Sequence, residues 1–332
     1  MIAALGNIIC KTATYTGLSA LRSALTAHKP RILMYHSIAD TPGILPDALN
    51  VTPAVFDEQL RSLTAHHTIV PLQRIVDHIR DGTPIPPRAI ALTFDDGLLN
   101  NLTIAAPLLA KHGATATFYV IGQSLNHKPL WLHRWYALHH PAENKHALSA
   151  LSTHLNIPIT TVREGVQRLK YHCPADKRDD ALDVVERICG KTFDPTLVPL
   201  MTPAHLKKLA SAGHTIGYHT FSHTPVAGLN PAQAKHELVA SKQEAEQHIG
   251  VTLDHFAFPF GEPSSLGGHE TLKKHYRSAV TTHEAFVTTD ADVHALPRLS
   301  VINASLSVFK ATLAGVRAAM ANTFQRLTRS RP

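Results

Sequence analysis

Apolar runs of strand length alternate with helical patterns along most of this 332-residue chain. Six segments read as strands because they are short, apolar and rich in β-branched and aromatic residues. They are residues 31–38, 89–96, 114–121, 214–221, 255–261 and 278–282. Segments with the helical spacing of apolar residues lie between them. This alternation is typical of parallel strands covered by helices, and it predicts an α/β fold.

Three of the expected helices have well-marked starts. Thr52, Thr202 and Asn230 each stand directly before a proline, so a side chain that can cap a helix precedes its first residue. The second of these helices should end at Gly213, because glycine readily adopts the left-handed conformation that closes a helix. The strand expected at 214–221 then begins at once, as the alternation requires.

Three segments fall outside the alternation. Residues 127–200 are rich in histidine and charge and contain no set of strands, so we expect a helical insertion there and not a second domain. Residues 1–30 are expected to form an N-terminal helical extension. Residues 303–332 should form a basic amphipathic helix, with Phe309, Val316 and Phe324 on its apolar face. Each end helix could pack on the domain or lie on a membrane surface.

Composition limits the classes of protein that the chain can belong to. With 44% hydrophobic and 17% charged residues it has an ordinary globular balance. Its net charge of +7 is compatible with an acidic partner such as a membrane surface, and we expect no nucleic-acid partner. Cys10, Cys173 and Cys189 lie far apart, which argues against a disulfide framework and a thiolate zinc site. Without a signal-peptide pattern or an apolar run of 18 residues, we expect a cytoplasmic protein that can contact the inner face of the membrane.

Two adjacent carboxylates, Asp95 and Asp96, end the apolar run "AIALTF". A run that is apolar throughout is typical of a parallel strand covered on both faces. In α/β folds the carboxyl ends of such strands are where functional sites are built. The alternative is a solvated turn in which Asp96 caps the following helix.

A pair of histidines, His219 and His223, ends the strand expected at 214–221. If this segment coils into a helical turn, residues four apart share one face and both imidazoles can reach one metal ion. With 24 histidines in the chain, roughly one or two pairs at this spacing are expected by chance. The position of the pair after a strand therefore carries more weight than its spacing.

One carboxylate and two imidazoles would together form a metal site with an open position. Asp96, His219 and His223 have the donor types of a catalytic zinc centre. The ion would neutralise Asp96, and Asp95 beside it could act as general base on a metal-bound water, whose pKa falls to about 7 in such sites. This division of roles explains why two carboxylates stand side by side.

A third segment, "FAFPFG", ends another expected strand with a rigid turn. After Pro259, the backbone N–H of Phe260 could point into the site and stabilise an oxyanion, or the segment could simply be a core strand that leaves the sheet. We expect Pro259 and Trp131 to contact the substrate. Trp131, Trp135 and Tyr136 could stack on a sugar ring or pack within the insertion.

The stretches "LMYHSI", "LTFDDG", "HTFSH" and "FAFPFG" in this order resemble the polysaccharide deacetylases of carbohydrate esterase family four. The resemblance covers about residues 31–302 and includes "LPRLSV" near the end. It implies a distorted (β/α) barrel of about seven parallel strands and metal-dependent removal of an N-acetyl group from an amino sugar. It also implies Asp95 as catalytic base, the Phe260 amide as oxyanion donor, and three metal ligands, namely Asp96, His219 and His223.

The chain departs from this pattern at two places. Many members of the family have an arginine two residues before the proline of the third motif, where it orients the catalytic aspartate, and Ala257 stands there instead. Arg298 in "LPRLSV" could take this role, or it could form a surface salt bridge. The histidine that usually protonates the leaving amine has no clear counterpart, and the candidates are His36, His283 and His294.

The sequence therefore predicts a hydrolase that uses Zn²⁺, with Co²⁺ or Ni²⁺ as alternatives, to deacetylate an N-acetylated saccharide. We expect a substrate made inside the cell, such as a lipid-linked intermediate of surface polysaccharide or glycolipid synthesis. The alternatives are a hydrolase of another C–N bond such as a cyclic amide, a non-catalytic carbohydrate-binding relative, and a peripheral membrane or interaction protein. The combination of two aspartates and two histidines weighs against the last two.

Overall fold

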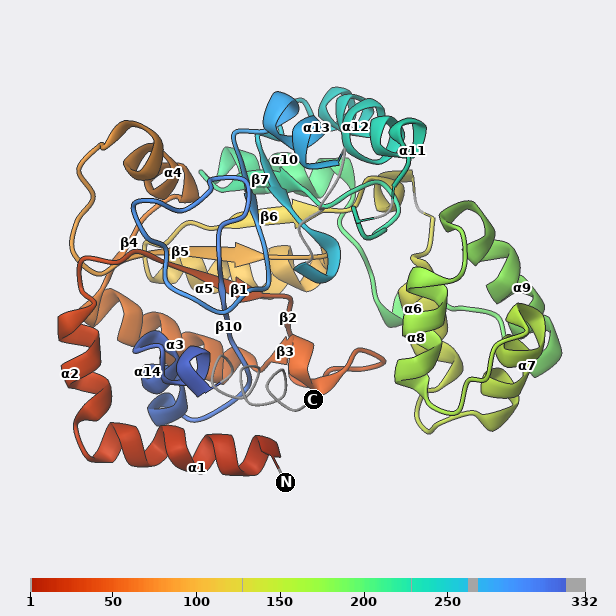
Figure 1. Ribbon diagram of the computed structural model, residues 1–332, viewed down its shortest axis with the longest axis horizontal. Helices are drawn as coiled ribbons and strands as arrows, with labels where there is room; N and C mark the ends of the chain where they lie inside the picture. The colour runs from red at the N-terminus through yellow and green to blue at the C-terminus, as the bar shows by residue number, and fades with distance from the viewer. Residues whose placement is uncertain (1, 127, 228, 262–267, 321–332) are drawn as a thin grey trace, which may run out of the picture.

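The computed structural model describes residues 2–126, 128–227, 229–261 and 268–320. Parallel strands form its main sheet, which curls into an open, distorted (β/α) barrel (Figure 1). Seven of them follow the order β10-β1-β5-β6-β7-β8-β9. Their bounds are β1 (Arg31–Tyr35), β5 (Ala89–Phe94), β6 (Thr117–Val120), β7 (Thr215–Tyr218), β8 (His255–Ala257), β9 (Ser278–Val280) and β10 (Leu299–Ser300). The predicted barrel of about seven parallel strands is confirmed.

All six expected strands are present, although the segment expected at 31–38 forms two strands, and the sequence patterns missed three further strands of two residues each. β4 (Thr68–Ile69) pairs with the beginning of β5, and β10 pairs with β1. β2 (Ser37–Ile38) and β3 (Asn50–Val51) form a separate two-stranded parallel sheet. Strands of two residues show no periodicity, so only their partners in the folded chain define them.

The long strands are buried on both faces, which explains why their sequences are apolar throughout. Every residue of β1, β5 and β6 is buried. Toward the helices, the Phe94 ring stacks on Tyr35 and Phe118 at centroid distances of 5.2 and 4.9 Å. The opposite face of the sheet carries a second cluster that includes Ile32 and Ala91. This packing holds the carboxyl ends of the strands in fixed positions.

Helices and short turns follow the strands and cover the sheet. They are α3 (Pro53–His66), α4 (Leu72–Asp81), the π-helical η2 (Asn101–Ala105), α5 (Ala106–Lys111), η3 (Gly122–Asn126), α10 (Pro203–Ser211), α11 (Pro231–Lys235), the π-helical η6 (His236–Ala240), α12 (Ser241–Ile249), η7 (Pro259–Gly261) and α13 (Gly268–His275). The remaining short 3₁₀ segment of this part is η1 (Asp47–Leu49).

The three predicted helix starts are confirmed, although only two are capped by a side chain. Thr202 accepts a hydrogen bond from the backbone N–H of His205, and Asn230 caps α11 in the same way. The Thr52 hydroxyl makes no cap and instead donates to Asn303 Oδ1 at 3.2 Å. Helix α10 ends at Ser211, and Gly213 follows with the left-handed φ of 86° expected of a terminating glycine.

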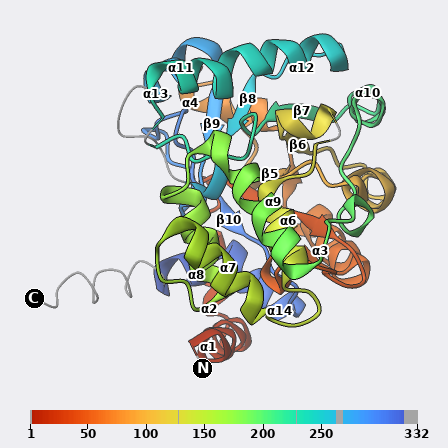
Figure 2. The same cartoon turned by 90° about the vertical axis from the view of Figure 1, so that its right-hand side faces the viewer.

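The predicted helical insertion is confirmed as a group of four helices with its own core around Trp135. They are α6 (Trp131–Leu138), α7 (Lys145–Leu155), α8 (Val162–Tyr171) and α9 (Arg178–Cys189), with short turns η4 (Ala175–Lys177) and η5 (Pro195–Leu197). Buried Arg134 joins α6 to α9 through ion pairs with Asp179, Asp183 and Glu186. Figure 2 looks onto these helices, which lie in front of the carboxyl ends of the strands.

Helices from both ends of the chain pack together beside α3. They are α1 (Ile2–Tyr15), α2 (Leu18–Leu25) and α14 (Leu306–Leu313). Cys10 and Ala13 of α1 are buried against Val308 and Ala311 of α14. The predicted C-terminal helix runs to residue 332, and its part from 321 onward lies outside the described residues. Within the described residues, we find no helix with the length and apolar character that a membrane span requires.

Candidate metal and catalytic site

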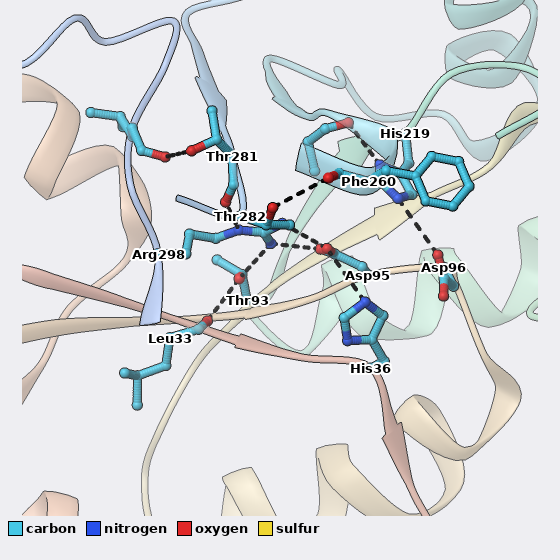
Figure 3. A network of polar contacts seen from close by, with 12 residues as sticks. Leu33, His36, Thr93, Asp95, Asp96, His219, Phe260, Thr281, Thr282 and Arg298 are labelled. Atoms are coloured by element: carbon cyan, nitrogen blue, oxygen red, sulfur yellow. Dashed lines mark hydrogen bonds and ion pairs between the residues drawn. The ribbon is translucent and has the colours of Figure 1, made fainter. Parts of the chain in front are cut away.

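The chemically distinctive side chains meet where the strands end, on the side of the barrel that faces the insertion (Figure 1). Asp95 and Asp96 follow β5, His219 follows β7, and Phe260 lies just beyond β8. Figure 3 shows how these side chains converge from separate strands. Parallel strands place their carboxyl ends at one edge, so residues distant in sequence become neighbours there.

Three predicted metal ligands form one buried cluster. Asp96 Oδ1 lies 3.5 Å from His219 Nε2 and 3.4 Å from His223 Nε2. All three side chains can place a ligand atom within 4.8 Å of the others, and all three residues are buried. Asp96 Oδ1 and His223 Nδ1 have no hydrogen-bond partner among the described residues. One carboxylate oxygen and two imidazole nitrogens around a common point fit a divalent transition-metal ion.

The electrostatic surroundings keep this cluster in a form that can bind a cation. Burial alone would raise the pKa of Asp96, but His219 and His223 hold it well below the ordinary value. Burial lowers the pKa of His223, which favours its neutral form. His219 Nδ1 lies 2.7 Å from the Ala257 carbonyl oxygen. If Nδ1 donates in this hydrogen bond, the lone pair of Nε2 is left for an ion.

The two histidines converge through a bent loop and not through a helical turn, so this expectation is wrong. Residues 219–223 are irregular, and Thr220 and His223 have left-handed φ values of 63° and 55°. Asp96 is also left-handed, with φ 73°, and Gly97 follows with φ 68°. A non-glycine residue in this region stores roughly 1–3 kcal/mol of strain, which the surrounding structure must offset. The Asp95–Asp96 turn is buried, which rules out the solvated-turn interpretation.

Arg298 holds the second carboxylate from a distant part of the chain. Its guanidinium donates to both oxygens of Asp95, each at 2.7 Å, and its Nε donates to the Thr281 carbonyl at 2.8 Å. Arg298 is fully buried, so the alternative of a surface salt bridge is wrong. Burial alone would raise the pKa of Asp95, and the Arg298 charge holds that pKa below its ordinary value.

Of the three histidines considered as proton donors, His36 is the one beside Asp95. Its Nε2 lies 3.9 Å from Asp95 Oδ2, and its side chain keeps 17% of its surface exposed. His294 is buried elsewhere, with Nε2 3.0 Å from the Tyr276 carbonyl oxygen. His283 is an exposed residue whose carbonyl accepts from the backbone N–H of Arg298. The geometry therefore separates three candidates that the sequence left equal.

Phe260 lies in a tight turn whose backbone is fixed on both sides. Its φ of 60° is left-handed, and its carbonyl accepts a hydrogen bond of 3.2 Å from Thr282 Oγ1 (Figure 3). Gly261 follows with φ 75°, where a Cβ atom would lie 1.9 Å from Thr282 Oγ1. The Phe260 ring packs edge-on against His223 at 4.8 Å between centroids. The segment therefore turns at the site, so the alternative of a plain core strand is wrong.

The insertion contributes a wall to the site. The Lys170 Nζ lies 4.0 Å from the centre of the Phe260 ring, and the Trp131 ring lies 6.2 Å from it. Trp131 is buried at 3% exposure, and Trp135 is fully buried with its indole N–H donated to the Val162 carbonyl. Trp135 therefore packs within the insertion, whereas Trp131 borders Phe260.

Two polar residues that sequence patterns did not reveal hold the loop that carries the histidines. The Glu237 carboxylate accepts from the backbone N–H of Phe221 and Ser222 at 2.9 and 3.0 Å, and from the Ser222 hydroxyl at 2.6 Å. From the insertion, Arg178 Nη1 donates to Thr224 Oγ1 at 2.7 Å. Neither residue belongs to a motif, because each acts from an element that folds beside the loop.

His133 of α6 is a further residue that motif spacing could not identify. It is buried at 2% exposure, and burial lowers its pKa to about 4, with a smaller opposing effect of Asp96 and a smaller lowering effect of His223. These interactions place α6 beside the candidate metal site. The insertion is therefore part of the surroundings of the site.

Comparisons with known proteins agree with the fold and with the motif order. The family model of polysaccharide deacetylases matches residues 82–278. YxkH of Bacillus subtilis (strain 168), whose name assigns it to the polysaccharide deacetylases, is 23% identical over 272 residues, which cover 81% of this chain and 70% of YxkH.

Solved structures of deacetylases share the fold. The deacetylase PplD of Streptococcus pyogenes, solved in complex with acetate, matches with a TM-score of 0.56 at 18% identity, over 82% of this chain and 92% of PplD. BC0361, a polysaccharide deacetylase from Bacillus cereus, matches with a TM-score of 0.58 at 19% identity, over 86% of this chain and 69% of that protein. The chain belongs to the polysaccharide deacetylase family, and is thus a hydrolase that acts on non-peptide carbon–nitrogen bonds.

Proposed function

We propose that this protein removes N-acetyl groups from an amino-sugar-containing saccharide and depends on a divalent metal ion for the reaction. The observation that carries the proposal is the pairing of two differently held carboxylates in one buried site. Asp96 converges with two imidazoles, while Asp95 is held by Arg298. Two neighbouring carboxylates in different surroundings can serve different chemical roles.

Asp96, His219 and His223 would hold the ion. Their donor set is that of many catalytic zinc sites, so we propose Zn²⁺, with Co²⁺ and Ni²⁺ as alternatives. A bound ion supplies Lewis acidity toward the acetyl carbonyl and lowers the pKa of a bound water to about 7.

The protein's own groups then carry out the proton transfers. Asp95 accepts a proton from the water that attacks the acetyl carbonyl carbon, and Arg298 keeps Asp95 ionised and correctly oriented. The backbone N–H of Phe260 donates to the oxyanion that the carbonyl oxygen becomes. When the carbon–nitrogen bond breaks, acetate and a free amine leave the site.

We propose His36 as the group that gives a proton to the leaving nitrogen. Its Nε2 lies 3.9 Å from Asp95 Oδ2, so the two groups can reach the same acetamide. Its exposed edge also gives it access to solvent protons. This chain has no clear counterpart of the family's usual histidine, and His36, which follows β1, takes its role.

The substrate proposed is an N-acetylated saccharide, such as a lipid-linked intermediate of surface polysaccharide or glycolipid synthesis. We propose that Pro259 and Trp131 border the bound sugar, with Trp131 packed behind the Phe260 ring. The burial of Trp131 favours a role as a wall over full stacking on a sugar ring.

Acetate release from N-acetylglucosamine oligomers tests the proposal. The wild-type protein should release acetate, a chelator should stop the release, and added Zn²⁺ should restore it. Asp95→Asn should lower the rate by at least about 10²-fold without loss of metal, because only the base is removed. Oligomer binding without acetate release would favour the non-catalytic carbohydrate-binding relative, and release of product from a cyclic amide alone would favour the other hydrolase.

A further inference from the structure

The N-terminal helix pair exposes a concentration of large apolar side chains. Among the described residues, six of the nine large hydrophobic residues that are exposed belong to α1 and α2 or to the turn between them. They are Ile8, Ile9, Tyr15, Leu18, Leu21 and Leu25. The other three lie in the helical insertion. Clusters of exposed apolar residues usually mark a surface that contacts a partner or a membrane.

These residues form a stripe on the outer face of the helix pair. Leu18, Leu21 and Leu25 occupy positions i, i+3 and i+7 of α2, and are 47%, 58% and 66% exposed. Ser19 of the same helix is buried on the opposite face. Helix α1 is likewise divided, since Cys10 and Ala13 pack on α14 while Ile8 and Tyr15 face outward. Docking of the helices on the domain therefore accounts for one face of each helix and leaves the apolar outer face unexplained.

The charged residues in the terminal segments are all basic. No aspartate or glutamate occurs before Asp40 or after Asp292, whereas both terminal segments contain lysine and arginine. α1 and α2 pack against α14, so the helices of these two segments lie together. Lys11 and Lys310 are exposed there. Glu284 lies in the same region, where it pairs with Arg317 at 4.0 Å, but α1, α2 and α14 themselves carry basic and no acidic residues. Exposed apolar residues on basic helices are complementary to a membrane surface that carries anionic lipids.

A cavity of about 330 Å³ lies behind the helix pair, between α2, α3 and α14. It is lined by hydroxyl groups, including those of Thr14 and Ser23, and by Arg88 and Lys310. His67 also lines it, and neither of its buried ring nitrogens has a hydrogen-bond partner among the described residues. Because buried Ser19 also lines this cavity, the cavity lies on the domain side of α2, away from the exposed leucines, and is not part of the docking surface.

We propose that the outer face of α1 and α2 docks on an anionic lipid bilayer. Figure 1 shows this helix pair on the opposite side of the barrel from the insertion. α2 leads into the beginning of β1, whereas the candidate site is built at the ends of the strands. The docking surface is thus separate from the candidate metal site. The proposal of membrane docking therefore does not depend on the proposed chemistry.

Vesicle sedimentation tests the proposal with the full-length protein. Wild type should sediment with phosphatidylcholine vesicles that contain phosphatidylglycerol, and more weakly with phosphatidylcholine alone or at high salt. The double variant Leu18→Ser/Leu21→Ser should bind at least about tenfold more weakly, because two apolar side chains no longer enter the interface. Lys11→Ala/Lys310→Ala should reduce the preference for anionic vesicles, because it removes two exposed positive charges beside the apolar residues.

The insertion offers a matched control. Ile188 and Leu197 are exposed to similar extents, 61% and 46%, so Ile188→Ser/Leu197→Ser should sediment as wild type does. Circular dichroism and acetate release from a soluble saccharide establish that each variant is folded. The proposal is overturned by absence of vesicle binding in wild type, by equal loss in both double variants, or by a wild-type dimer that Leu18→Ser/Leu21→Ser dissociates. In the last case the occupant of the surface is a second copy of the chain.

Discussion

Arg298 and Asp95 lie 203 residues apart in the chain, yet they form a bidentate ion pair with two hydrogen bonds of 2.7 Å at the carboxyl ends of the barrel strands. The planar guanidinium matches the carboxylate, so the pair fixes the orientation of Asp95 as well as its charge. This ion pair lies next to the candidate metal site, and it gives Asp95 surroundings that differ from those of the adjacent Asp96. Asp96 is directed to the histidines and Asp95 is directed to the arginine (Figure 3).

Replacement of Arg298 should impair both stability and activity. Arg298→Ala leaves the Asp95 carboxylate buried without its partner, which costs roughly 3–5 kcal/mol of unfolding free energy. Arg298→Lys keeps the charge but loses the two-pronged contact, so it should fold more stably than Arg298→Ala and still lose most of its acetate release. Chemical denaturation and acetate release measure the two effects. A fully active Arg298→Lys would show that the orientation of Asp95 does not depend on the guanidinium.

His36→Gln should lower acetate release from an N-acetylated saccharide by about 10²- to 10⁴-fold, because protonation of the amine is removed. The same variant should retain nearly full activity on an aryl acetate ester, whose leaving group needs no proton. His283→Gln is the control, since it changes an exposed histidine near Arg298. Equal losses on the amide and the ester would contradict the assignment of His36 as the acid.

Sequence patterns were sufficient for the site residues that directly follow strands. The carboxyl end of an apolar strand is a recognisable place, so Asp95, Asp96 and His219 could be assigned to one end of the barrel before the fold was known. For Arg298 the sequence left two roles open, a contact with the catalytic aspartate or a surface salt bridge. Nothing in the neighbouring sequence shows that a residue beside the two-residue strand β10 reaches Asp95 at the end of β5. The choice among His36, His283 and His294 likewise depended on distances that spacing does not encode.

Residues that support the site from neighbouring elements could not be predicted at all. Glu237 and Arg178 act through hydrogen bonds to a loop that is distant in sequence, and each lies in an otherwise ordinary helical segment. The conformation of that loop was predicted wrongly for the same reason. Thr220 and His223 adopt left-handed φ values in a loop that Glu237 and Arg178 hold from other elements, and spacing alone does not indicate them.

Glu237→Gln should weaken metal binding by about tenfold while leaving the fold intact. The two backbone N–H groups of Phe221 and Ser222 donate to Oε2, and the Ser222 hydroxyl donates to Oε1. The side-chain amide of the variant has only one oxygen, so its NH₂ group must face one of these donors, and the loop between the two histidines loses its fixed shape. Titration of the metal-free protein with Zn²⁺ measures the affinity. Glu246→Gln is the control, because Glu246 also accepts a backbone hydrogen bond, from Leu253 at 2.8 Å, away from this loop. Equal Zn²⁺ affinities for Glu237→Gln and wild type would remove Glu237 from the account.

The stability of the protein should fall as the pH decreases from about 6.5 toward 4. Burial lowers the pKa of His255 to about 4, against a smaller opposing effect of Asp254. In this window the unfolded chain binds the proton that the folded protein excludes, so acid favours unfolding. One such group removes about 2 kcal/mol of unfolding free energy at pH 5 relative to neutral pH.

His255→Gln should therefore flatten the dependence of unfolding free energy on pH between about 6.5 and 4. His248→Gln, at an exposed histidine of α12, should leave that dependence unchanged. Urea denaturation across this pH range measures both. Parallel pH profiles for wild type and His255→Gln would show that His255 is not among the groups that cause the acid sensitivity.

The central claim is that Asp96, His219 and His223 bind a catalytic divalent ion, and the most direct test is the amount of metal bound per chain. Elemental analysis should find about one zinc or similar ion in wild type supplied with metal at neutral pH. His219→Ala should lose the ion, and His283→Ala should retain it. A wild-type protein that binds no ion under these conditions, or a His219→Ala variant that keeps a full equivalent, would contradict the account.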